Sequence, residues 1–559
     1  MENIALAFSG GGFRAAAFST GCISYLNKVK YNGRPLLQNV KFISSTSGGS
    51  ITNLLYSAYT YEGKSFDEFY KDLCSALEGE KLLAAALHNL NKPKAAWKGR
   101  PDKNVNAINA FSLAYDDFLK QREFSLFSNR QQNPHLEEIC VNSTEFTNGY
   151  AFRFQSQDNS TAGITNGLIG NKNIFFNKEG IEFAEKIKLA DILASSSCFP
   201  SGFEPMIFPH DYTRAALSKE DLLKGLSFTA NAYSLPHDNY NNTDFMEDEN
   251  FKKEIQFGIM DGGVADNQAI DAFMLADKRR VKDGRKKFDL FMSCDVTSYL
   301  MDGYTLPVAK KKWYDFISFN TAKWFAIIIF SLIALWLPLS LIYFFHCWHW
   351  WNTVSAAVSA VFFIPGSVWL LKKIFSPKQK KAGGTWELVF KKYMGVFTGM
   401  GLGGLKQLLM VRAKSVFILA NDVYLKQIRR LYYERLYSDP NYKDRVIQNA
   451  IYDLSRAKFP AGVFHVPEKG EPPVPSDMMI AVAEKARTMG TTLWFDANHE
   501  KENIKNCIIA TGQFGTCYNL LSFISKMQTK TPAIILLEKE LSEDYAAFMK
   551  NPMMMVEKQ

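Results

Sequence analysis

Residues 4–14 of the chain, IALAFSGGGFR, decide the fold that the sequence predicts. Residues 4–8 form a continuous apolar run, as expected of a parallel strand that is covered on both faces. The glycines that follow let the backbone turn sharply, and helical spacing then extends over about residues 14–30. A buried strand that passes through a glycine turn into a helix predicts an α/β fold.

The turn Gly10-Gly11-Gly12 is also a candidate binding site for an anion. Successive backbone N–H groups in such a turn can point toward one ligand, and the following helix adds the positive end of its dipole. The anion is either a nucleotide phosphate or the oxyanion that develops when an acyl ester is attacked, and a plain tight turn is a third interpretation. The glycines alone do not choose among the three.

A second strand-turn-helix unit has its strand at about residues 39–44 and its helix at about residues 50–61, with the turn Ser45-Thr46-Ser47-Gly48-Gly49-Ser50 between them. A nucleophilic serine needs a strained turn that lifts its hydroxyl clear of the backbone, and only small neighbours fit there. Ser45 and Gly49, two positions before and after Ser47, are small. Helix entry also directs N–H groups toward the attacked carbonyl. The motif indicates a nucleophile at Ser47, and a plain helix N-cap is the alternative.

Further strands are predicted at about residues 255–260 and 288–294, and helical spacing appears over residues 185–194 and 416–433. The first of these strands leads into the motif Asp261-Gly262-Gly263. We expect Asp261 at the same carboxyl edge of the sheet as Ser47, where open α/β sheets bind ligands. An Asp-Gly turn without a function is the alternative.

In this order, the glycine turn, the Ser47 turn and the Asp-Gly-Gly motif closely resemble the patatin-like phospholipase family. The resemblance implies a three-layer α/β sandwich with a mainly parallel central sheet and a Ser-Asp dyad that works without histidine. It implies that Ser47 attacks the ester and that Asp261 accepts the serine proton. It also implies an elbow shaped by Ser45, Gly48 and Gly49, and an oxyanion hole framed by Gly10, Gly11, Gly12 and Arg14. The family's chemistry implies no cofactor and no metal.

The resemblance extends to other segments. Residues 142–154 are similar to the family's hairpin, residues 194–205 to its Ala-Ser-Ser segment, and residues 416–435 and 491–521 more weakly to its closing helices. The sequence departs from the pattern in two places: Ser45 replaces the first glycine of G-x-S-x-G, and Ala15 stands where many members have glycine. Both residues are small enough for the turn to form. The two departures affect the expected geometry of the oxyanion hole.

Histidines do not form a second catalytic pattern. A Ser-acid-His triad would need a histidine late in the chain, and neither His465 nor His499 follows a convincing strand. His346 and His349 flank Cys347, but an aromatic loop at a membrane surface explains them better than a metal site.

Residues 324–371 contain no Asp, Glu, Lys or Arg, and they are long enough for two membrane spans at about 324–345 and 353–371. The turn between the spans carries no Lys or Arg, whereas lysines lie on both flanks: Lys310, Lys311, Lys312 and Lys323 before the hairpin, and Lys372, Lys373, Lys378, Lys380 and Lys381 after it. Both ends of the hairpin are therefore expected in the cytoplasm, with the catalytic domain and both termini. A buried helical pair in a soluble domain is the alternative.

The formal net charge of +9 suits an anionic partner. Because the lysine clusters flank the predicted spans and no recognition motif for nucleic acid appears, we expect a lipid bilayer as partner and no nucleic acid. The eight cysteines include no C-x-x-C pair, which favours a reducing compartment.

Together these patterns predict a catalytic core over residues 1–300, a juxtamembrane segment and hairpin over residues 301–385, and a C-terminal helical part over residues 386–559 that completes the catalytic domain. The expected function is a membrane-anchored serine hydrolase of the phospholipase A type, cleaving acyl esters of membrane glycerophospholipids. An acyltransferase or lysophospholipase of the same fold, and a catalytically dead membrane scaffold, are the alternatives.

Overall fold

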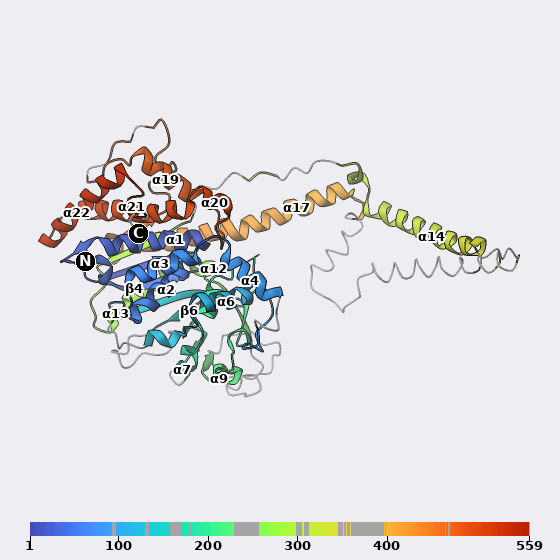
Figure 1. The fold of residues 1–559 in the computed structure, drawn as a ribbon, viewed down its shortest axis with the longest axis horizontal. Coiled ribbons are helices and arrows are strands. Elements are labelled where there is room, and N and C mark those ends of the chain that lie inside the picture. The colour runs from blue at the N-terminus through green and yellow to red at the C-terminus, as the bar shows by residue number, and fades with distance from the viewer. Residues whose placement is uncertain are drawn as a thin grey trace. The chain divides into compact units, whose positions relative to one another are not determined.

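The protein is described from a computed structural model that covers residues 1–91, 97–128, 134–156, 169–177, 180–200, 202–228, 256–297, 304–306, 312–344, 350, 354, 358, 396, 398–463, 465–467 and 470–557 (Figure 1). The chain divides into two compact units. Residues 1–301 and 420–559 form the first unit, and residues 302–419 form the second. The second unit therefore extends past residue 385, where the sequence patterns set its end.

The first unit is built on a mixed sheet with the strand order β10-β8-β7-β6-β5-β4-β1-β12-β13. Its parallel part runs from β5 to β13. The strands from β6 to β10 on the other edge of β5 are antiparallel, and so are β11, which pairs with the end of β5 on the same edge as β4, and β9, which pairs with β11. The parallel strands are β1 (Ile4–Phe8), β4 (Val40–Thr46), β5 (Glu138–Glu145), β12 (Leu290–Asp295) and β13 (Val446–Ala450). The antiparallel strands are β6 (Ala151–Gln155), β7 (Ile169–Gly170), β8 (Ile174–Phe176), β9 (Met206–Phe208), β10 (Leu226–Phe228) and β11 (Phe257–Asp261).

Helices cover both faces of the parallel strands, which confirms the predicted α/β class. Alternate side chains of β1 divide between two cores, because successive residues of a strand point to opposite faces. Ile4, Leu6 and Phe8 join the core that contains α1 (Gly12–Lys28), α2 (Gly48–Tyr61) and α21 (Ile504–Ser525). Ala5 and Ala7 join the core that contains α13 (Ile270–Lys282) and α18 (Tyr424–Ser438).

The remaining helices of the first unit surround this sandwich (Figure 1). The predicted helix over residues 185–194 is two helices, α7 and α8. The break falls at Lys188, which adopts an extended conformation and forms a bridge with Glu123. The bounds are α3 (Phe66–Ala76), α4 (Lys81–Asn91), α6 (Ala107–Phe118), α7 (Ile181–Glu185), α8 (Leu189–Ser196), α9 (Lys219–Lys224), α12 (Gly263–Asp266), α19 (Asp477–Thr488), α20 (Ala497–Lys501) and α22 (Pro532–Lys550).

The C-terminal residues contribute a strand as well as helices to the first unit. Strand β13 extends the parallel sheet beyond β12, and it was missed because it is only five residues long. Helix α21 lies against α1 at two glycines: a Cβ on Gly21 would lie 2.1 Å from the carbonyl oxygen of Ile509, and one on Gly512 would lie 2.3 Å from that of Phe18. This close approach makes α21 part of the core.

By length and composition, α21 is the one helix among the described residues that could cross a membrane, and 78% of its most apolar window is buried. Its burial against α1 identifies it as a core helix. The first predicted span falls on α14 (Phe319–Phe344), of which residues 319–333 form a shorter apolar stretch. The second predicted span lies outside the described residues, except for Val354 and Val358. The two-span hairpin therefore stays a prediction.

Within the second unit, α17 (Leu402–Ile418) begins against the short helix η4 (Trp313–Phe316). Leu402 N–H donates to the carbonyl of Ile317 at 2.8 Å, and a Cβ on Gly403 would lie 2.4 Å from Cβ of Asp315. The predicted helix over residues 416–433 corresponds to the end of α17, a π-helical turn over Leu419–Val423 and the first part of α18.

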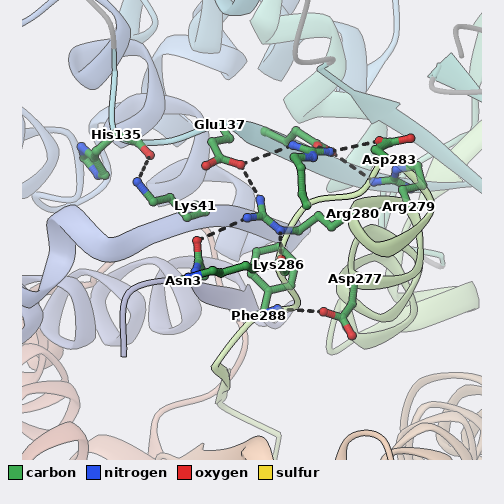
Figure 2. Close-up of polar contacts among 12 residues, drawn as sticks. Asn3, Lys41, His135, Glu137, Asp277, Arg279, Arg280, Asp283, Lys286 and Phe288 are labelled. Atoms are coloured by element: carbon green, nitrogen blue, oxygen red, sulfur yellow. Dashed lines mark hydrogen bonds and ion pairs between the residues drawn. The ribbon is translucent and has the colours of Figure 1, made fainter. Parts of the chain in front are cut away.

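Charged residues hold the edge of the sheet where β5 begins (Figure 2). Arg280 of α13 pairs with Glu137, while Arg279 and Arg285 pair with Glu138 at 3.3 and 2.8 Å. Arg280 also donates to the side chain of Asn3, just before β1, at 3.3 Å. The pairs hold the start of β5 close to the start of β1, and they supply the positive charge that a buried carboxylate such as that of Glu138 needs. The candidate site lies toward the opposite end of β5.

Candidate active site

Ser47 lies in a strained turn between β4 and α2. Its backbone adopts φ 50° and ψ −124°, a conformation that residues with a side chain rarely occupy. The turn leaves no room for larger neighbours: a Cβ on Gly48 would lie 2.1 Å from the carbonyl oxygen of Gly12, and one on Gly49 would lie 2.7 Å from that of Phe8. Glycines at these two positions therefore follow from contact with β1 and the glycine loop.

Two residues from other elements secure the turn. Ser47 N–H donates to Oγ of Ser196 at 2.9 Å, and this hydroxyl donates to the carbonyl of Asn142 at 2.6 Å. The side-chain amide of Asn142 in turn donates to the carbonyl of Ser45 at 2.9 Å. All three groups are buried, so the chain of hydrogen bonds fixes the turn against β5 and α8. Rigid support of this kind is what a strained turn at a functional site requires.

Ser45, which stands where the family pattern has glycine, has partners for its hydroxyl. Its Oγ lies 3.0 Å from Oγ of Ser50 and accepts a hydrogen bond from the Asn53 amide at 2.8 Å. The serine is fully buried. The extra hydroxyl is accommodated because α2 supplies polar groups at the matching positions.

Asp261 ends β11 and meets Ser47 by a route that the sequence did not predict. Strand β11 is antiparallel to β5, pairing with residues 143–145, whereas β4 is parallel to β5 and pairs with residues 138–142. Because β6 occupies the other edge of β5, β4 and β11 share one edge and run toward each other. The ends of the two strands meet there, and they bring Ser47 and Asp261 together.

The pKa of the Asp261 carboxyl group lies near neutral pH, so both its protonated and its ionised form are populated there. Burial raises its pKa to about 7, against hydrogen bonds from the Gly263 N–H and the Ser47 hydroxyl that lower it. The Gly263 N–H donates to Oδ1 at 2.6 Å. A carboxylate with a pKa near the operating pH is well suited to accept a proton.

The glycine loop lies directly beside Ser47. A Cβ on Gly10 would lie 3.3 Å from Cβ of Ser47, and Gly11 and Gly12 have φ values of 145° and 60°. Gly10 N–H donates to the carbonyl of Asn267 at 2.8 Å. In the part of the chain that the structure describes, the N–H groups of Gly11 and Gly12 donate to no protein atom, so they are available to an anion next to Ser47.

Arg14 does not point toward Ser47. Its guanidinium donates to the carbonyls of Arg487, at 3.4 Å, and Met489. Burial lowers its pKa to about 10, although the charge of Asp295 acts in the opposite direction. The structure thus brings together Gly10, Gly11, Gly12, Ser45, Ser47, Gly48, Gly49 and Asp261, and places Arg14 behind the loop.

Other carboxylates and histidines near the sheet edge have different partners. Asp266 accepts from the N–H of Asp271 at 2.7 Å at the start of α13, and Asp295 pairs with Arg429 at 2.7 Å. His499 pairs with Asp496, and the His465 ring packs against Phe459. No hydrogen bond between described residues joins a histidine to Ser47 or Asp261. His346, Cys347 and His349 lie outside the described residues.

An apolar cavity of about 170 Å³ is lined by one residue that follows the glycine loop and by one residue of α2. Phe13 follows Gly12 directly, and Ile51 lies one helical turn after Ser47 on α2. The apolar part of its lining comes chiefly from these two residues and from α3, α4 and α6: Phe13, Ile51, Leu77, Leu82, Ala114 and Phe118. A cavity of this composition fits an aliphatic chain.

Sequence reasoning missed the supporting residues. Asn142 and Ser196 lie in segments that resemble the family, but nothing in their pattern indicated that they secure the turn. Asn267 ends the motif that carries Asp261, and its backbone, not its side chain, makes the contact. The backbone of Thr492 also contacts the loop, from a segment without a local signal.

Comparison with known proteins gives one family. Residues 6–274, which include the glycine loop, Ser47 and Asp261, match the model of the Patatin-like phospholipase family. Among solved structures, human GIVD cytosolic phospholipase A2 is similar with a TM-score of 0.31 and 13% sequence identity, over 53% of this chain and 46% of that chain. The chain thus spans less than half of that relative. No curated protein sequence matches the chain.

Proposed function

Because residues 6–274 form a domain of the patatin-like phospholipase family, we propose that the protein is a membrane-anchored serine hydrolase that cleaves acyl esters of glycerophospholipids. The observation that carries the proposal is the meeting of a strained serine, Ser47, with a buried carboxyl group whose pKa is raised to about 7, that of Asp261. Nucleophilic catalysis needs this pairing of an exposed hydroxyl and a base.

In the proposed first step, Asp261 accepts the hydroxyl proton as Ser47 Oγ attacks the ester carbonyl. Negative charge then develops on the carbonyl oxygen, and the N–H groups of Gly11 and Gly12 would stabilise it. The protonated Asp261 gives its proton to the departing alcohol oxygen, here the glycerol oxygen of the lysophospholipid. The acyl group remains on Ser47.

In the second step, Asp261 accepts a proton from water, whose oxygen attacks the acyl carbonyl. The tetrahedral intermediate collapses, the fatty acid leaves, and Asp261 returns the proton to Ser47. One carboxyl group thus serves as base and acid in turn. A pKa near neutrality suits this double task, since both protonation states are then accessible.

The cavity beside Phe13 and Ile51 supports the proposal that the enzyme recognises the acyl group of its substrate. The lining of the cavity includes the residue after Gly12 and the fourth residue after Ser47, and consists mainly of aliphatic and aromatic side chains. Burying an aliphatic chain contributes about 0.8 kcal/mol for each methylene group. Part of an acyl chain would therefore favour this cavity in the proposed complex.

The second unit supports membrane anchoring. Within α14, which has 26 residues, the described apolar stretch over residues 319–333 is shorter than the roughly 20 residues that cross the hydrocarbon core of a bilayer, and the uncharged sequence that follows it would supply the remaining length. Large apolar side chains around α14 are exposed, among them Trp324, Ile328, Phe330, Ile333 and Trp336. A helix in water does not normally expose apolar groups on all sides. Anchoring would hold the enzyme at the surface where its substrate is concentrated.

Two other functions use the same site. In an acyltransferase an alcohol would replace water in the second step, and a lysophospholipase would accept a lipid with a single chain. A dead scaffold would retain the fold without turnover. The products formed by the wild-type protein distinguish these functions.

The Ser47→Ala variant is expected to lose ester hydrolysis by at least about a thousandfold, because the acyl acceptor is removed. The measurement is mass spectrometry of lysophospholipid and fatty acid released from vesicles of mixed glycerophospholipids. The exposed serine of α22 gives a control, Ser542→Ala, which should keep full activity. Turnover retained by Ser47→Ala would contradict the assignment.

The cavity predicts the chain length of the substrate. Ala84 and Ala85 on α4 are both exposed, but only Ala85 lines the cavity. Ala85→Leu narrows the space, so kcat/KM should fall about tenfold for a long acyl ester and little for a short one. Ala84→Leu should leave this ratio unchanged. The ratio to measure is kcat/KM for p-nitrophenyl palmitate divided by kcat/KM for p-nitrophenyl butyrate. If this ratio is the same in Ala85→Leu as in Ala84→Leu, the cavity is excluded as the acyl site.

The two-span topology predicts which positions an impermeant thiol reagent can reach. In a background without Cys347, Trp348→Cys should be labelled from outside intact cells, whereas cysteines at positions 305 and 385 should react only after permeabilisation. The protein should also remain in the membrane fraction after a carbonate wash. Release by the wash, or labelling of positions 305 and 385 on opposite sides, would contradict the hairpin.

A further inference from the structure

Residues 489–495, here called the strap, join α19 to α20 and cross the back of the glycine loop. The strap lies far outside residues 6–274, which match the family. The carbonyl of Thr492 accepts a hydrogen bond from Phe13 N–H at 2.7 Å. A Cβ on Gly12 would lie only 2.2 Å from the same carbonyl oxygen, so the strap fills the space against the loop.

Side chains reinforce this contact. The ring of Phe495 lies 5.8 Å from the ring of Phe13, and Phe495 N–H donates to the carbonyl of Gly79 at 3.1 Å. Arg14 donates to the carbonyl of Met489 at the first residue of the strap. Arg14 and Phe495 are both buried. The strap is therefore fixed to both residues that follow Gly12.

The loop is held from its other side by the motif that carries Asp261. Gly10 N–H donates to the carbonyl of Asn267 at 2.8 Å. With Gly10 N–H and Phe13 N–H both occupied, the two N–H groups between them, of Gly11 and Gly12, are left for a ligand. The contacts at the two ends of the loop determine where these groups point.

We propose that the strap is a positioning element for catalysis: by accepting the Phe13 N–H and the Arg14 guanidinium, it orients the Gly11 and Gly12 N–H groups toward the oxyanion. The inference rests on the proposed hydrolase function. It assigns a role in the reaction to residues that follow the second unit in the chain. Arg14, Thr492 and Phe495 are then positioning residues, since none of them touches the reacting atoms.

Such a role has a kinetic signature that a general loss of stability lacks. Oxyanion donors act on the transition state and contribute little to the bound ester, so displaced N–H groups lower kcat and leave KM unchanged. A trifluoromethyl ketone carrying an acyl chain forms a tetrahedral adduct with a nucleophilic serine. Its inhibition constant should therefore rise in parallel with the loss of kcat.

The side chain of Thr492 allows a conservative test in the full-length protein. Its Oγ1 donates to the carbonyl of Trp494 at 2.7 Å, which shapes the strap. Thr492→Val removes this hydrogen bond at nearly constant volume, and Thr492→Ser retains it. Thr488 gives a matched control: it is exposed at the end of α19, and its hydroxyl bonds only to the carbonyls of Glu484 and Lys485 in its own helix.

Thr492→Val should lower kcat by about tenfold or more, with KM and the thermal midpoint close to wild type. The affinity for the trifluoromethyl ketone should fall by the same factor. Thr492→Ser should restore both values, and Thr488→Val should behave as wild type. If Thr492→Val does not fold, Phe495→Leu, which retains apolar volume but loses the ring contact with Phe13, should show the same changes.

Wild-type kcat and ketone affinity in the folded strap variant would overturn the inference, and so would a change in KM alone. Failure of the proposed function is distinguishable. In that case the wild-type protein itself would neither hydrolyse p-nitrophenyl esters nor bind the ketone at Ser47. An active wild type with an unaffected strap variant refutes only the role of the strap.

Discussion

The site depends on one constraint in the sheet: two strands share a single edge of β5 and end against each other. β4 arrives parallel to β5 and stops at Thr46, and β11 arrives antiparallel and stops at Asp261. Ser47 begins α2 directly after β4, and the fully buried carboxyl of Asp261 is enclosed at the junction. Burial at that junction raises the pKa of Asp261, so the same packing that brings the two groups together also suits the carboxyl for accepting a proton.

Sequence patterns predicted the local units well, because each depends on contacts within a short stretch. The strand, turn and helix at residues 4–28 and 40–61 follow from apolar runs that end in glycine or small residues. The direction of β11 was not predicted. A strand that ends in an acidic residue looks the same whether it runs parallel or antiparallel, and only pairing with β5 decides its direction.

The sequence also could not predict backbone contacts between distant segments. The backbone carbonyls of Asn267 and Thr492 hold the two ends of the glycine loop. Every residue has such a carbonyl, so the residue type at these positions gives no signal. The resemblance predicted Arg14 at the oxyanion hole, but its side chain reaches the end of α19 and the strap behind the loop. The family pattern located the proposed reacting groups, and the C-terminal residues that support the glycine loop lie beyond residues 6–274.

The central claim is that Asp261, with a pKa raised to about 7, accepts the proton of Ser47. The most direct test is the pH dependence of kcat/KM for a soluble p-nitrophenyl ester, which reports ionisations of the free enzyme. Since only the ionised carboxylate can take the proton, kcat/KM should rise as pH increases through about 7 and level off above it. A rate that is already maximal at pH 5, as an ordinary carboxyl group with a pKa of about 3.9 would give, would contradict the account.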